Sequence, residues 1–208
     1  MSRTALILVD LQHDFMPGGA LAVAGGDETV AVANRLIPSY ELVVATQDWH
    51  PAQHESFAAN HAGRQPGEVI DLHGLPQVLW PVHCVQGTAG AALHSALDVA
   101  GIDFVVRKGT DPAVDSYSAF YDNGHRQTTG LAAELRRRGV EAVHILGLAT
   151  DYCVKFTALD AVAEGFATTL LLEGCRGVEL TPGDTTRALD ALQAAGVTVR
   201  DREPAGSP

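Results

Sequence analysis

The sequence predicts an α/β protein with a doubly wound, mostly parallel sheet that carries helices on both faces, a Rossmann-like three-layer arrangement. Two observations support this fold class: short apolar runs alternate along the chain with segments of helical spacing, and turn residues follow most of the apolar runs. The chain has 208 residues, no internal repeat and no linker, so residues 1–208 are expected to form a single domain.

Six short apolar runs predict the strands, since strands buried on both faces of a parallel sheet are apolar throughout. These runs are 4–9, 42–46, 103–107, 142–148, 168–172 and the edge strand 197–200. Helical spacing predicts helices at 28–39, 90–100, 128–138 and 184–195. A further helix is expected to start at Thr150 or Asp151, either of which can serve as N-cap, and to stop at Gly165.

Two long segments, 51–81 and 110–127, show little periodicity and many turn residues. An irregular segment of that length inside a compact domain is usually functional, so 51–81 is expected to cover a site. The tail 203–208 is expected to fray.

Composition narrows the function classes. Hydrophobic residues make up 46% of the chain and charged residues 19%, which argues against disorder. A formal net charge of −11 disfavours nucleic acid or an anionic membrane as partner, and no apolar run is long enough to span a bilayer. Three distant cysteines, an odd number with no C-x-x-C pair, and an N-terminus without a signal pattern favour the cytoplasm.

Nucleotide binding is the obvious alternative for such a fold. However, the turn after the first strand, 10–14, has no glycine triplet through which a pyrophosphate could approach, and no Gly-Lys-Ser/Thr loop occurs. We therefore expect no dinucleotide cofactor.

Chemistry-bearing residues gather where strands end. Asp10, Asp48 with His50, Lys108 and Cys153 follow or end four predicted strands, and ligands of open α/β sheets bind beyond that carboxyl edge. Each residue alone has a structural explanation, as a cap, a turn residue or a solvated strand end. Together they predict an acid, a base, a cation and a thiol around one crevice.

Cys153 falls in the first turn of the helix expected after the fourth of these strands. Unpaired N–H groups and the positive end of the helix dipole favour a thiolate there, and the same N–H groups can hold an oxyanion. A buried, inert cysteine that happens to start a helix is the alternative, and position alone does not decide between the two.

Asp48 and His50 point to the same side of an extended chain, and His83 could complete a set of two histidines and one carboxylate. His54 is a further candidate ligand. Such ligands suit zinc, iron or manganese. With nine histidines in the chain, some proximity is expected by chance.

Several ordered motifs, which span nearly the whole chain, resemble those of the nicotinamidases, also called pyrazinamidases, of the isochorismatase-like cysteine hydrolase superfamily. The motifs lie at 8–15 with 17–19, 46–51, 80–88, 107–109, 115–120 and 147–154. The resemblance implies a catalytic triad of Asp10, Lys108 and Cys153 and a metal site of Asp48, His50 and His83. His54 matches a position that ligates the metal in some members only, and a cis peptide is expected between Leu148 and Ala149.

The resemblance also implies hydrolysis of nicotinamide, and by expectation pyrazinamide, to the acid and ammonia through a thioester, within NAD salvage. Backbone N–H groups of Ala149 and Cys153 would form the oxyanion hole. One divalent ion, with zinc expected first, would orient the pyridine ring, and Phe15, Trp80 and Tyr117 are the candidates for packing against it. Core packing is the competing explanation for each aromatic residue.

Three alternatives stay open. Another amidohydrolase of the superfamily, acting on a carbamoyl or ureido substrate, would keep the triad without needing the metal. An isochorismatase would not call for a nucleophilic thiol, and a non-catalytic metal or thiol sensor would need neither Asp10 nor Lys108 beside the thiol. The sequence leaves the oligomeric state undecided, with a homo-oligomer as one outcome.

Overall fold

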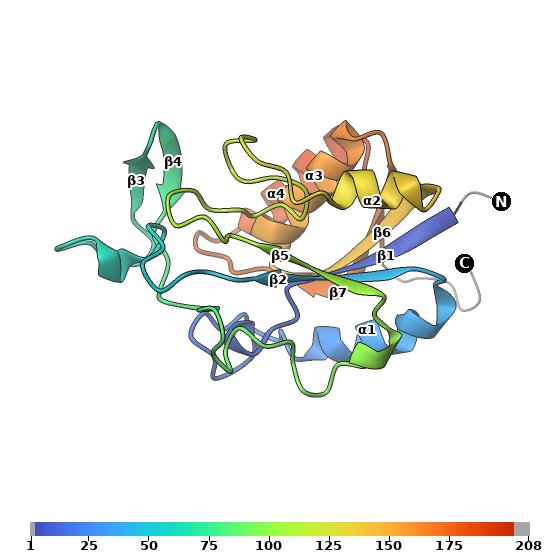
Figure 1. Ribbon diagram of the computed structural model, residues 1–208, viewed down its shortest axis with the longest axis horizontal. Coiled ribbons are helices and arrows are strands. Elements are labelled where there is room, and N and C mark those ends of the chain that lie inside the picture. Colours follow the sequence, from blue (N-terminus) through green and yellow to red (C-terminus); the bar gives the residue numbers. More distant parts are fainter. Residues whose placement is uncertain (1–2, 202–208) are drawn as a thin grey trace.

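Six parallel strands form the central sheet of the computed structural model, which describes residues 3–201 (Figure 1). Their order is β5-β2-β1-β6-β7-β8, and every neighbouring pair is parallel. The strands are β1 (Arg3–Val9), β2 (Val43–Asp48), β5 (Phe104–Lys108), β6 (Val140–Leu148), β7 (Ala167–Arg176) and β8 (Thr198–Arg200). The expected fraying of 203–208 concerns a segment outside the described residues.

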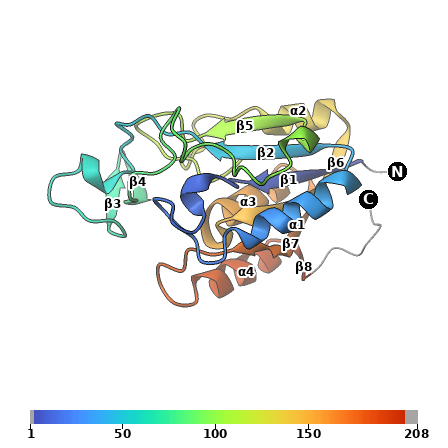
Figure 2. The same ribbon diagram turned by 90° about the horizontal axis from the view of Figure 1, so that it is seen from below.

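Helices cover both faces of the sheet, which confirms the doubly wound three-layer arrangement. Helix α1 (Glu28–Leu36) lies on one face, and α2 (Leu131–Arg137), α3 (Lys155–Ala163) and α4 (Asp184–Ala194) lie on the other (Figures 1 and 2). The chain steps outward from β1 to β2 and from β6 to β7 in opposite directions. Because such crossovers are right-handed, the connecting helices α1 and α3 fall on opposite faces.

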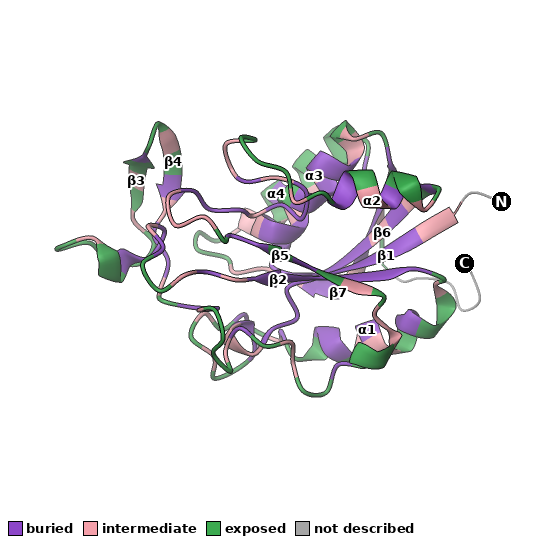
Figure 3. Ribbon diagram, in the orientation of Figure 1, coloured by how far each residue is buried: buried purple, intermediate pink, exposed green. Residues whose placement is uncertain are grey.

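The core lies in the middle strands. Residues 5–9 of β1 are all fully buried, and in Figure 3 the sheet is mostly purple while exposed residues gather on the outer sides of the helices. No helix within 3–201 is long and apolar enough to cross a membrane.

The order of the strands reverses between β1 and β6. From this pair the chain winds to β2 and β5 on one side and to β7 and β8 on the other. The carboxyl ends of β1 and β6 therefore part at a topological switch point, where α/β proteins form their ligand crevice. Asp10 follows β1 directly, and Cys153 follows β6 after a short turn.

The expected helix at 90–100 is wrong. This stretch contains only a 3-10 turn, Val99–Gly101; before it lie turns and bends, with Leu93 paired to Gln12 in an isolated antiparallel bridge. The N–H groups of His13 and His94 donate to the carbonyl oxygens of Ala92 (3.1 Å) and Leu11 (2.8 Å). These long-range backbone bonds replace the local bonds that a helix would have made.

The segment 51–81 is not structureless, which corrects a second expectation. It includes a 3-10 turn, Ala58–Asn60, and an antiparallel hairpin of β3 (Val69–Leu72) and β4 (Leu75–Val78). The hairpin turns at His73 and Gly74, both with positive φ, as a tight two-residue hairpin turn requires. The segment 110–127 contains no helix or strand, as expected.

Candidate active site

Lys108 lies at the centre of the cluster that the strand ends form. Its Nζ is 2.8 Å from Asp10 Oδ2, 3.4 Å from Cys153 Sγ and 3.0 Å from the carbonyl oxygen of Ser116, and it also contacts Asp48 Oδ1. The Lys108 side chain is completely buried. The structure thus brings Asp10, Asp48 and Cys153 together around Lys108, so residues from all four predicted strand ends meet.

Burial and Lys108 set the charges of this cluster. Burial acts to raise the pKa of the Asp48 carboxyl, but Lys108 and His50 outweigh it and hold that pKa well below its usual value. Burial also acts to lower the pKa of Lys108, but Asp10 and Asp48 raise it well above its usual value, so Lys108 stays an ammonium. The pKa of Asp10 is raised, with burial as the largest cause.

Cys153 does not gain a thiolate from its helical position alone, which corrects the expectation drawn from the helix dipole. Burial raises the pKa of the Cys153 thiol well above its ordinary value, and Lys108 lowers it only in part. Burial thus works against a thiolate at Cys153. One carboxylate oxygen of Asp10 lies within 4.8 Å of Cys153 Sγ.

The turn that carries Cys153 is π-helical, from Thr150 to Val154, and continues into α3. The N–H groups of Tyr152 and Val154 both donate to the carbonyl oxygen of Ala149 at 3.1 Å. The peptide between Leu148 and Ala149 is cis, which confirms the expectation.

The expected N-cap is wrong for both candidates, Thr150 and Asp151, because the N-cap position is Ala149. The helix begins without a side-chain cap bond, and neither Thr150 nor Asp151 provides one. The Asp151 carboxylate instead accepts the backbone N–H groups of Val178 (2.9 Å) and Glu179 (2.8 Å), which ties the segment after β7 to the cysteine turn.

Asp10 is held in place by Thr46 from the neighbouring strand β2. The Thr46 hydroxyl donates to Asp10 Oδ1 at 2.5 Å and accepts the Asp10 backbone N–H at 3.1 Å. Asp10 itself has a positive φ of 51°, a conformation uncommon for non-glycine residues, though aspartate adopts it more often than most.

Asp48, His50 and His83 form a compact ligand-like group, with one ligand atom of each within 4.8 Å of the others. The Nε2 atoms of His50 and His83 lie 3.5 and 3.7 Å from Asp48 Oδ2. Their Nδ1 atoms face the carbonyl oxygens of Gly109 and Pro81, both at 2.8 Å. His83 reaches the group because residues 84–86 run beside His50, bonded to its N–H and carbonyl.

This group fits a divalent cation. The Nε2 atom of His50 is buried and has no hydrogen-bond partner within the described part of the chain. In both His50 and His83, Nδ1 faces a backbone carbonyl oxygen and Nε2 faces the Asp48 carboxylate. Metal-binding histidines usually have this orientation, with one ring nitrogen held by the protein and the other free for the metal. The nearby set of Asp10, Asp48 and Cys153 is also compact, but the ammonium of Lys108 already supplies its positive charge.

Two more buried polar residues adjoin this group. The His54 ring lies 4.3 Å from the His50 ring between centroids, and His54, His50 and Asp115 offer ligand atoms within 4.8 Å of one another. Burial lowers the pKa of His54 to about 4, so its imidazole is neutral near pH 7. Sequence reasoning missed Asp115, although it lies in one of the motifs quoted above.

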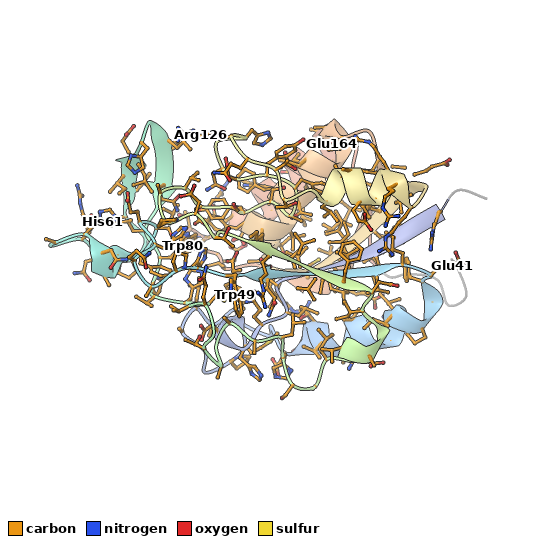
Figure 4. The ribbon with its side chains drawn as sticks, in the orientation of Figure 1. Glu41, Trp49, His61, Trp80, Arg126 and Glu164 are labelled. Atoms are coloured by element: carbon orange, nitrogen blue, oxygen red, sulfur yellow. The ribbon has the colours of Figure 1, made fainter. Side chains whose placement is uncertain are left out.

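A cavity opens beside the cysteine and the ligand-like group. Phe15, Trp80 and Tyr117, the three aromatic candidates, all line it, together with Asp48, His83, Ala149 and Cys153. Trp80 Nε1 donates to the Tyr117 hydroxyl at 3.1 Å, and Figure 4 shows Trp80 between the hairpin and the sheet. Tyr152, which sequence reasoning missed, packs edge-on against Trp80 with 4.8 Å between ring centroids. The only feature of the sequence that could have pointed to Tyr152 is its position next to Cys153.

Comparison with known proteins agrees with this arrangement. The model of the isochorismatase domain matches residues 4–204. A nicotinamidase of Escherichia coli is 52% identical over 203 residues, which cover 96% of this chain and 95% of the relative.

Solved structures show the same similarity. A nicotinamidase/pyrazinamidase of Acinetobacter baumanii superposes with a TM-score of 0.93 at 45% identity over 96% of both chains. A pyrazinamidase of Pyrococcus horikoshii, solved in complex with zinc, has a TM-score of 0.77 at 39% identity over 95% of this chain and 98% of that one. The family match spans nearly the whole chain and the cluster lies at its switch point, so the chain belongs to the isochorismatase family.

Proposed function

We propose that this protein is a nicotinamidase, a single-domain enzyme that hydrolyses nicotinamide, and also pyrazinamide, to the carboxylic acid and ammonia. One observation carries the proposal: the buried Lys108 joins Asp10 to Cys153, and Cys153 lines a cavity together with Asp48 and His83. The relatives support the substrate class, because the Escherichia coli relative is named a nicotinamidase and the Acinetobacter structure a nicotinamidase/pyrazinamidase. The product acid would enter NAD salvage.

Cys153 is the nucleophile in this proposal, and Asp10 is its base. Because burial keeps Cys153 a thiol, its proton passes to the Asp10 carboxylate as Sγ attacks the carboxamide carbon. Lys108 stays an ammonium throughout and stabilises the negative charge on Asp10 and on the sulfur.

The carbonyl oxygen of the substrate becomes an oxyanion, for which the backbone N–H groups of Ala149 and Cys153 are the proposed donors. Asp10 then returns its proton to the leaving nitrogen, so ammonia departs and a thioester with Cys153 remains. A water molecule, deprotonated by Asp10, hydrolyses the thioester and regenerates the thiol.

Asp48, His50 and His83 are the residues proposed to hold a divalent ion, with zinc expected first and iron or manganese as alternatives. When bound, the ion would coordinate the pyridine nitrogen and orient the ring. Phe15, Trp80 and Tyr117 line the cavity and would pack against that ring. Fixing the ring in this way places the amide carbon over Cys153, a positioning effect of several kcal/mol, on the order of effective-molarity gains.

Ammonia release from both amides tests the function. The pure protein is assayed before and after chelation, beside the Cys153→Ala variant. We expect turnover of both amides, loss of activity on chelation with recovery on adding zinc, and a fall of at least about ten-thousandfold in kcat for Cys153→Ala.

The same assay separates the alternatives. Activity on carbamoyl or ureido compounds that survives chelation would assign the site to another amidohydrolase of the superfamily. Binding of nicotinamide without any ammonia release would overturn the enzyme proposal and favour a sensor. Elemental analysis of the active protein identifies the ion.

A further inference from the structure

The chain has two lysines, Lys108 and Lys155, and their surroundings differ. Lys108 is paired with two carboxylates in the active site. Lys155, the first residue of α3, is half-buried, and its Nζ lies over the Phe156 ring, 4.6 Å from the ring centroid. Among residues 3–201, no carboxylate oxygen lies within ion-pair distance of Nζ and no hydrogen-bond acceptor contacts it. Lys155 therefore has three N–H donors that no acceptor in this part of the chain satisfies.

Lys155 lines a pocket of about 420 Å³ that opens between β4 and the first turns of α3 and α4, a size within the usual range of roughly 300–1,000 Å³ for small-molecule pockets. Tyr117, Tyr152 and Phe156 form an aromatic wall of this pocket, in which neighbouring ring centroids lie 5.4 and 5.5 Å apart. Tyr117 and Tyr152 also line the cavity that contains Cys153. The pocket and the cavity therefore share a wall, and Lys155 lies on the pocket side of it.

The other charged side chains of the pocket are already engaged. The Asp151 carboxylate accepts two backbone N–H groups, as described above. Asp184 accepts the Thr181 N–H at 2.8 Å and pairs with Arg187 at 2.7 Å. Burial lowers the pKa of Lys155, although both carboxylates act to raise it, so neither replaces a bound counter-ion. The electrostatics of the pocket therefore favour an anion at Lys155.

We propose that this pocket is a second binding site of the protein, for a small aromatic carboxylate. The carboxylate accepts hydrogen bonds from the Lys155 ammonium, and the ligand ring packs against Tyr117 and Phe156. The acid released by the proposed reaction has this chemistry, since nicotinate and pyrazinoate are each one flat ring with one carboxylate. The choice of these acids rests on the proposed function, whereas the site rests on Lys155 and the aromatic wall.

Charge separates the ligand of this pocket from the substrate of the cavity. Nicotinamide has the same ring, but its carboxamide is neutral and forms no ion pair with Lys155. We expect the acid to bind in the pocket at least about tenfold more tightly than the amide, which corresponds to the lower end for a hydrogen bond to a charged group. Product and substrate can therefore be bound at the same time, one on each side of the shared wall.

Fluorine NMR with 5-fluoronicotinate as probe counts the sites in the zinc-loaded protein. We expect two saturable binding events, one in the cavity and one in the pocket. Lys155→Met should weaken the pocket event at least about tenfold, and Lys155→Arg should retain it because it keeps the charge. Arg64→Met is the matched control, because it removes the same charge from an exposed residue outside the pocket. Equal losses in Lys155→Met and Arg64→Met, or a pocket event that Lys155→Met leaves intact, would overturn the site.

Competition by nicotinamide keeps this inference apart from the proposed function. In the Cys153→Ala variant the amide is not consumed, and excess nicotinamide should displace the probe from the cavity while the pocket stays occupied. A single event that nicotinamide displaces and Lys155→Met leaves intact would overturn the pocket and leave the nicotinamidase proposal standing. A single event that Lys155→Met removes and nicotinamide does not displace would uphold the pocket and count against nicotinamide as the substrate.

Initial rates of ammonia release give a readout besides binding. Lys155 does not line the cavity, so Lys155→Met should keep the initial rate of the parent protein, with urea unfolding as the check that the variant is folded. A large fall in kcat of the folded variant would show that Lys155 acts on the reaction itself, and would overturn its assignment to a separate site.

Discussion

Lys108 places one positive charge between two buried carboxylates, Asp10 and Asp48, and also contacts Cys153. Two carboxylates without a cation would be very costly to bury, so the ammonium is needed for folding as well as for the reaction. Because Asp48 also belongs to the proposed metal group, Lys108 links the catalytic cluster to the metal site.

Replacing Lys108 by methionine should therefore affect stability and activity together. We expect the Lys108→Met variant to lose about 3–5 kcal/mol of unfolding free energy, because two buried carboxylates lose their partner. Its kcat/KM should fall at least about a thousandfold. Urea unfolding and ammonia release measure the two effects, with Lys155→Met, a half-buried lysine outside the cluster, as control. A Lys108→Met variant as active as the control would contradict the role.

At the scale of elements, the contact between β1 and β6 aligns the ends from which Asp10 and Cys153 follow. Gly147, near the end of β6, has a φ of +129°, and a Cβ atom there would lie 2.1 Å from the carbonyl oxygen of Val9. Glycine is thus required twice, by its conformation and by the close approach of the β1 backbone.

Gly147→Ala tests this contact against a matched glycine. Gly165, at the end of α3, also has a positive φ (+86°), but a Cβ atom there meets nothing within 4 Å. We expect Gly165→Ala to cost about 1–2 kcal/mol, from backbone conformation alone. Gly147→Ala should cost clearly more and also reduce kcat, because β6 must move away from β1. Equal unfolding free energies for the two variants, measured in urea, would show that the close approach does not matter.

The sequence predicted the elements unequally well, for a physical reason. All six strands of the sheet were predicted, and the four inner strands β1, β2, β6 and β7 have the most continuously buried apolar runs. The helix expected at 90–100 does not form, since backbone bonds from His13 and His94 tie that segment to residues 11–13. The β3–β4 hairpin was missed because its short strands are largely exposed and lack an alternating pattern.

At the scale of the whole molecule, a bound ion should couple the site to global unfolding. Asp48, His50 and His83 come from two distant segments, 48–50 and 81–88, so their arrangement exists only in the folded chain. An ion that binds the folded state alone stabilises it by about 2.7 kcal/mol at a concentration of a hundred times its dissociation constant.

Zinc should therefore raise the melting temperature. For a domain of this size we expect a rise of roughly 5–10 °C over the chelated protein at that zinc concentration, from a typical 2–4 °C per kcal/mol. The rise should vanish in His83→Ala and persist in His94→Ala, a histidine away from the cluster. Differential scanning calorimetry checks it; a full rise in His83→Ala would remove that residue from the proposed ligand set.

The sequence by itself determined the fold class and the family, and it singled out the candidate site residues, because strand periodicity and ordered motifs are local properties of the chain. Only the tertiary structure decided the charges and proton positions. Burial raises the pKa of the Cys153 thiol, and the backbone N–H of Ser56 donates to Nδ1 of His54. Solvation and hydrogen-bond partners are properties of the folded arrangement in space, and no spacing along a chain records them.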